Sequence, residues 1–94
     1  MVYVMNRIRI KDFEAWKKVF DHGSEFRKAG GSLGGQALRN AQDLNEIFVI
    51  LKWDTLENAK KFGQSEEFRK LLQEAGVMGK PEAFFLEEIE KVQN

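Results

Sequence analysis

The chain has 94 residues, enough for one domain with a single modest core and too few for a second domain. Its 15 lysine and arginine residues balance 15 aspartate and glutamate residues, so the formal net charge is zero and no overall field favours nucleic acid or an anionic membrane. With no cysteine and one histidine, the chain excludes disulfides, thiolate zinc sites and a multi-histidine metal site within one copy.

The first segment, residues 2–10, alternates its side chains with the period of a strand. The even-numbered residues of this segment are apolar except for Asn6. Residues 13–29 follow as a predicted helix, because aromatic and aliphatic side chains recur there at steps of three and four. Asp12 is a suitable cap for this helix, and the glycines at 30 and 31 are expected to end it.

The middle of the chain predicts two strands joined by a turn. Residues 32–41 are weakly apolar, and Gly34 and Gly35 mark a bulge or a close backbone approach in that strand. Residues 42–45 have the composition of a turn. Residues 47–53 form the strongest strand signal, and because both parities are apolar, the strand must be covered on both faces.

Two short helices are predicted in the second half of the chain. The first opens with Asp54, Thr55 and Glu57, an acceptor at the cap followed three residues later by a glutamate, and it ends at Gly63. Ser65 caps the second, which ends at Gly76. Each carries apolar residues along one side, so each is expected to pack on the sheet.

The chain closes with a turn around Gly79 and Pro81 and a strand over residues 82–90. The resulting order predicts a single α+β domain over residues 1–94, a ferredoxin-like βαββαβ fold with a four-stranded antiparallel sheet and its helices on one face. The other face still carries apolar side chains. We therefore expect a second copy to cover it, giving a homodimeric α+β barrel.

Five segments carry a resemblance to a known family. They are IKDFEAW (10–16), FRKAGGSLGG (26–35), LRNAQDLNE (38–46), KWDTLENAKKF (52–62) and AGVMGKPEAFFLEE (75–88). The chain resembles the dimeric α+β barrel proteins related to antibiotic-biosynthesis monooxygenases, especially a subfamily of short members. The resemblance implies the fold, but it leaves the activity open, because the superfamily holds oxygenases, haem-degrading enzymes and isomerase-like members.

Two branches of that superfamily bear on the chemistry. The haem-degrading branch resembles the chain at Asn6 and Arg7, but Phe62 and Leu72 stand where that branch has a pocket tryptophan and an axial histidine. Leucine cannot ligate iron, so haem binding is disfavoured. The branch that oxidises polyketides and quinols uses a substrate that reacts with oxygen almost unaided, and it needs groups that stabilise an oxyanion. This branch implies no cofactor and no metal.

Three residues are candidates for a catalytic role. Asn6 needs polar partners, which are either neighbouring protein groups or a bound ligand. His22, on the border of its helix's apolar arc, is either a half-exposed boundary residue or a proton carrier. Arg27 falls inside the apolar arc. Its methylenes either cover apolar surface while the guanidinium reaches water or backbone carbonyls at the helix end, or it acts as an anion clamp in a pocket between helix and sheet.

Four further residues are candidates for substrate binding. The rings of Trp16, Trp53 and Tyr3 are large and amphipathic, and each is either core or a pocket wall. Arg39 either pairs with a carboxylate at a dimer seam or closes a pocket.

The function expected from the sequence is binding of a small aromatic or hydrophobic metabolite, with cofactor-independent monooxygenation or an isomerase-like reaction as the enzymatic form. The alternative is a noncatalytic dimeric module that binds a ligand or a protein. An open, polar-lined cavity beside Asn6 favours the enzyme, whereas filling by Trp16, Phe20, Phe62 and Met78 favours the module. No segment has the length of a membrane span or the pattern of a signal peptide, so we expect a cytoplasmic protein.

Overall fold

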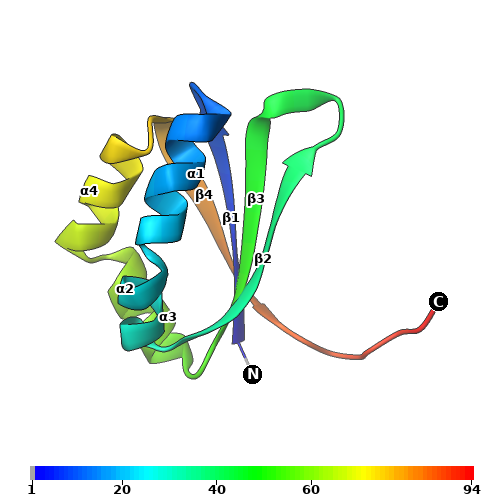
Figure 1. Cartoon of the computed structure of the whole chain (residues 1–94). Coiled ribbons are helices and arrows are strands. Elements are labelled where there is room, and N and C mark those ends of the chain that lie inside the picture. The colour runs from blue at the N-terminus through cyan, green and yellow to red at the C-terminus, as the bar shows by residue number, and fades with distance from the viewer. Residues whose placement is uncertain (1) are drawn as a thin grey trace.

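The computed structural model describes residues 2–94, and these contain four strands and four helices. In chain order they are β1 (Val2–Ile10), α1 (Phe13–His22), α2 (Ser24–Gly30), β2 (Ser32–Asn40), β3 (Asp43–Trp53), α3 (Leu56–Gly63), α4 (Glu66–Glu74) and β4 (Val77–Glu87). The strands form one antiparallel sheet in the order β2-β3-β1-β4, and the helices cover one face of it (Figure 1). The predicted ferredoxin-like α+β fold is confirmed, with two helices on the first crossover where one was expected and two on the second, as expected.

The central strand β1 fixes which side chains face the helices. It pairs with β3 on one side and β4 on the other, and Asn6 lies opposite Val49 and Ala83. Because successive side chains of a strand point to opposite faces, the even-numbered residues of β1 face the helices. Tyr3 and Arg7 therefore lie on the face that the helices leave open.

The single helix predicted over residues 13–29 is wrong, because the chain breaks at Gly23 into α1 and α2. The break lets α1 contact α4 while α2 contacts α3. Gly23 is buried, and a Cβ atom there would lie 3.0 Å from Nη1 of Arg27 and 3.5 Å from Cδ1 of Leu71. Apolar spacing continues across the break, so periodicity alone did not reveal it.

The expected irregularity in β2 is confirmed at its glycines. The pairing of β2 with β3 shifts register between Ser32 and Gly35, and Gly34 has a positive φ of 92°. A Cβ atom on Gly35 would lie 1.9 Å from the carbonyl oxygen of Ile50, so the two backbones approach too closely for any side chain. The turn predicted over residues 42–45 is shorter, because β3 already begins at Asp43.

Two predictions in the second half are corrected. Thr55 is the N-cap of α3 instead of Asp54, since Thr55 Oγ1 accepts a hydrogen bond from the Asn58 backbone N–H at 3.0 Å. The turn expected around Gly79 and Pro81 is part of β4, which begins at Val77. A register shift against β1 between Arg7 and Arg9 accommodates these residues, as a bulge tolerates proline.

The two faces of the sheet differ in burial. The core lies between sheet and helices and includes Ile10, Trp16, Ile47 and Trp53. Apolar side chains of the open face stay partly exposed, and they include Leu38, Met78, Phe84 and Leu86. Beyond β4, residues 88–94 lead away from the sheet on the side opposite the helices (Figure 1). None of the helices described within residues 2–94 has the length and apolarity needed to cross a membrane.

Candidate active site

A cavity of about 490 Å³ lies between the sheet and the helices. Its lining combines three strands with all four helices, and its polar side chains are those of Asn6, Arg27, Lys60 and Gln64 together with the indoles of Trp16 and Trp53. Trp16, Phe20 and Phe62 line the space without filling it, and Met78 is outside it on the open face. The volume is within the range of small-molecule sites, so this is the open arrangement that favours ligand binding.

Aromatic rings form much of the cavity wall. Trp16 and Phe20 of α1 stack with their ring centroids 4.9 Å apart. Phe62 of α3 contacts the rings of Phe26, Trp53 and Phe68 at centroid distances of 4.9, 5.0 and 5.2 Å. Flat apolar walls of this kind complement an aromatic or otherwise hydrophobic ligand.

Asn6 is the polar side chain on the floor of the cavity. It lies between Val4 and Ile8 on the helix-facing side of β1 and is half-buried. The side-chain amide of Asn6 has no hydrogen-bond partner among residues 2–94. Because the residue is half-buried, the partner of this amide is either water or a ligand in the cavity.

Trp53 at the end of β3 is a second donor without a partner. The residue is 2% exposed and lines the cavity, and its Nε1 is the buried side-chain polar atom left unpaired within the described residues. Leaving a buried N–H unpaired costs free energy, and such groups call for an explanation. A ligand oxygen in the cavity would remove that cost if it reached this buried N–H.

Arg27 of α2 is half-buried in the cavity wall. Its Nη1 donates to the carbonyl oxygen of Phe20 at 2.8 Å, and its guanidinium carbon lies 4.0 Å from the centroid of the Phe20 ring. Burial lowers the pKa of Arg27, and the charge of Asp21 opposes that effect. The group remains protonated at neutral pH because an arginine pKa is so high.

Lys60 and Gln64 line the same cavity, and sequence reasoning did not identify either residue. The Lys60 Nζ lies 5.9 Å from the centroid of the Phe85 ring. Both residues belong to the α3 segment and its exit, where the sequence indicates only an exposed polar side of a short helix. The rotation of α3 against β4 decides their position, and no local pattern carries that information.

Three predicted site residues lie outside the cavity lining. His22 is exposed at the end of α1, so it is not placed to move a proton there. Tyr3 lies on the open face, where its hydroxyl donates to Glu88 Oε1 at 3.3 Å, and burial followed by the Glu88 charge raises its pKa. Arg39 lies on the helix side of β2 with its guanidinium carbon 4.7 Å from the centroid of the Phe13 ring.

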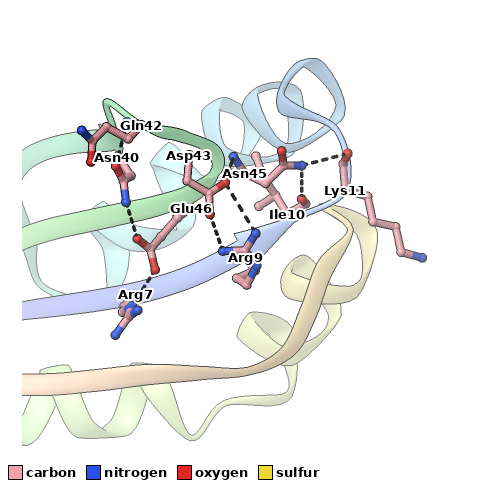
Figure 2. Close-up of polar contacts among 9 residues, drawn as sticks. All are labelled: Arg7, Arg9, Ile10, Lys11, Asn40, Gln42, Asp43, Asn45 and Glu46. Atoms are coloured by element: carbon pink, nitrogen blue, oxygen red, sulfur yellow. Dashed lines mark hydrogen bonds and ion pairs between the residues drawn. The ribbon is translucent and has the colours of Figure 1, made fainter.

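A separate polar cluster occupies one end of the open face (Figure 2). Glu46 accepts from Arg7 Nε and from Asn40 Nδ2, each at 2.8 Å, and these two contacts lower its pKa, the Asn40 bond most. Asp43 accepts from Arg9 Nη1 at 2.8 Å, which likewise lowers the pKa of Asp43. Both arginines of this cluster therefore have a carboxylate partner.

Comparison with known sequences gives one family. The family model described as antibiotic biosynthesis monooxygenase matches residues 1–74. No curated protein matches the chain.

Solved structures with the same fold share little sequence with the chain. A Bordetella bronchiseptica protein proposed to be an antibiotic biosynthesis monooxygenase has a TM-score of 0.82 at 13% identity, covering 95% of this chain and 97% of that one. SnoaB, a cofactor-independent oxygenase from Streptomyces nogalater, has a TM-score of 0.79 at 14% identity, covering 99% and 97%. A Caulobacter crescentus protein with the same proposed assignment has a TM-score of 0.75 at 19% identity, covering 95% and 90%. At these identities the likeness supports the fold alone.

Proposed function

The chain belongs to the antibiotic biosynthesis monooxygenase family, and we propose that its helix-side cavity binds a small aromatic metabolite and oxidises it with O₂ without a resident cofactor. The observation that carries the proposal is the cavity of about 490 Å³ with two donors, the Asn6 amide and the Trp53 indole, that have no partner among residues 2–94. Two such donors suit a substrate oxygen that gains negative charge during the reaction.

The proposed reaction needs no external reductant. A phenol reacts with one O₂ and gains one oxygen atom on its ring to become a quinone. The second oxygen atom leaves as water, and the two hydrogens of that water come from the ring carbon and the hydroxyl of the phenol. The protein contributes by excluding water with its aromatic walls and by holding the developing oxyanion with Asn6 and Trp53. SnoaB is described as a cofactor-independent oxygenase, and a reaction of that class is what we propose here.

The proposal includes a homodimer. Leu38, Phe84 and Leu86 are between 42% and 45% exposed on the open face of the sheet, which no helix covers. A second copy related by a two-fold axis would bury the same set of side chains on both subunits. The size of the exposed apolar set supports this assembly over a solitary subunit.

A noncatalytic ligand-binding module is the second candidate. It is favoured by one observation: the cavity lining contains no carboxylate and no histidine, and His22 is exposed elsewhere. Without a group that accepts a proton near neutral pH, turnover requires a substrate that ionises readily by itself.

Oxygen uptake and quinone absorbance across a panel of phenols and quinols test the proposal. Asn6→Val and Trp53→Phe are each expected to lower kcat/KM by about 100-fold, the cost of removing one oxyanion donor. Tyr3→Phe removes a polar hydrogen from the opposite face of the same sheet and is expected to leave kcat/KM unchanged.

The outcomes separate the candidates. Turnover that survives both cavity substitutions would contradict the proposed oxidation. Ligand binding without oxygen uptake would assign the noncatalytic module. A Soret band after reconstitution with haem would revive the haem reading, against the expectation from Phe62 and Leu72, which both line the cavity.

A further inference from the structure

A second hollow of about 680 Å³ lies between α2 and the first half of β2. It shares Phe20, Arg27 and Leu51 with the helix-side cavity, and its other lining residues include Lys28 and the glycine-rich run of residues 31–37. We call this second hollow the α2 groove. Because Arg27 lines both spaces, the cavity and the α2 groove adjoin at this residue.

We propose that the cavity ligand carries a carboxylate and that Arg27 binds it at the boundary of the cavity and the α2 groove. The inference rests on the proposed function, since it names the chemical class of the ligand for the same cavity. Arg27 is then a specificity-determining residue that contacts the ligand away from the reacting oxygen at Asn6 and Trp53.

The charges around the cavity support this ligand class. Its lining contains two cations, Arg27 and Lys60, and no acidic residue. In the α2 groove the acid is Asp54, whose Oδ1 already accepts from the Thr55 backbone N–H at 2.7 Å and from Asn58 Nδ2 at 3.0 Å. The net charge that a ligand meets is therefore positive.

Arg27 has no carboxylate within ion-pair distance among residues 2–94. The acid whose charge acts on it, Asp21, forms its ion pair with Lys17 Nζ at 2.6 Å. The hydrogen bond that Arg27 makes uses Nη1 alone, on the carbonyl oxygen of Phe20. A guanidinium has five N–H donors, so most of its donors remain for a ligand.

The surroundings hold the guanidinium in place before a ligand arrives. It stacks on Phe20, and the Phe20 carbonyl anchors one nitrogen. Gly23 provides the room, because a Cβ atom at that position would lie 3.0 Å from Nη1. A planar fork that is held in place and keeps N–H donors unused matches the two oxygens of a carboxylate.

Isothermal titration with 2-naphthoic acid and 2-naphthamide tests the inference, because the two probes differ in charge at the same position. The native protein is expected to bind the acid at least 10-fold more tightly than the amide. Arg27→Gln is expected to remove that preference, because the affinity for the acid falls more than the affinity for the amide. Arg27→Lys keeps the charge without the fork and is expected to keep part of the preference, which also covers a failure of the glutamine variant to fold.

Arg39→Gln is the matched control, since Arg39 also stacks on a phenylalanine ring but lies outside both hollows. Equal binding of acid and amide by the native protein would overturn the carboxylate inference and leave the proposed function intact. A preference that persists in both Arg27 variants would overturn the assignment to Arg27. Binding of neither probe at millimolar concentration would count against the proposed aromatic site and this inference together.

Discussion

The cationic side chains on the two faces of the sheet have different kinds of partner. On the open face, Arg7 and Arg9 have carboxylate partners at 2.8 Å, Glu46 and Asp43. On the helix face, Arg27 has a carbonyl and an aromatic ring, and Lys60 has an aromatic ring. Paired charges on the open face fix the local structure, whereas cations without carboxylates in a cavity are available to a ligand. The comparison shows why one face is the candidate for chemistry.

The two faces also differ in how their apolar side chains are covered. Four helices bury the helix side, and residues such as Ile47 and Val49 are less than a tenth exposed. On the other side Phe84 and Leu86 are exposed by 42% and 43%. A face that retains this much exposed apolar area is suited to association. One face therefore serves a ligand and the other, under our proposal, a second subunit.

The bulge in β2 decides which residues of that strand reach each face, and breaking it is expected to have the largest effect. Gly35→Ala would place a methyl group 1.9 Å from the Ile50 carbonyl oxygen, so we expect a loss of about 3 kcal/mol of unfolding free energy. Gly34→Ala meets no atom within 4 Å and faces only its positive φ, so it should cost about 1 kcal/mol. Chemical denaturation of both variants measures this, and equal losses would contradict the close approach.

A charge on the open face tests whether that face is an interface. Phe84→Asp is expected to convert a dimer at micromolar concentration into a monomer, because a buried unpaired carboxylate opposes association. Leu56→Asp, a comparably exposed position on α3, should leave the assembly intact. Sedimentation velocity measures the assembly state of both variants. A monomeric native protein would refute the proposed pairing of the open faces.

A substitution at Gly23 tests whether the space at this residue positions the Arg27 guanidinium on the helix face. Gly23→Ala would press a methyl group against Arg27, so we expect the preference for the carboxylate probe to fall about threefold with a small loss of stability. Gly79→Ala is the matched control, since Gly79 lies outside both hollows and its new methyl would meet no atom within 4 Å, leaving only the strain of its positive φ. Titration with the acid and amide probes measures the change. An unchanged preference would show that the room at Gly23 does not position the guanidinium.

The paired carboxylates of the open face give the smallest expected effect, visible as a pH dependence. The folded state holds the pKa of Glu46 and Asp43 below their ordinary values of 4.5 and 3.8, so it binds fewer protons than the unfolded chain. Their stabilising contribution is present above those ordinary values and is lost as the pH falls through the lower folded ones.

Glu46→Gln should therefore make the fall in Tm between neutral and acidic pH shallower, because one of the two titrating groups is removed. Glu90→Gln, in the exposed segment after β4, should leave that fall unchanged. Thermal melts across the pH range read the effect. Identical curves for all three proteins would mean that the cluster in Figure 2 contributes nothing measurable.

Much of the fold could be predicted from the chain because its strongest patterns are local. Alternation in residues 2–10 and the apolar run at 47–53 gave the two central strands, and the glycines at 34 and 35 gave the bulge. The errors lie where distant packing overrides a local signal. Gly79 reads as a turn residue but lies in β4 at the register shift against β1, where its positive φ of 70° fits a bulge instead of a chain reversal.

For the candidate site, the sequence by itself determined which side chains break an apolar pattern: Asn6 in a strand and Arg27 in a helical arc, and both line the cavity. Strand parity also separates Tyr3 from Asn6, since odd and even residues of one strand face opposite sides. Only the tertiary structure decided that His22 stays outside, that Lys60 enters the lining and that Trp53 has an unpaired indole. Periodicity fixes a residue's direction within its own element, but the enclosure of a cavity depends on how helices rotate and pack against a sheet, and that is set by contacts between residues far apart in the chain.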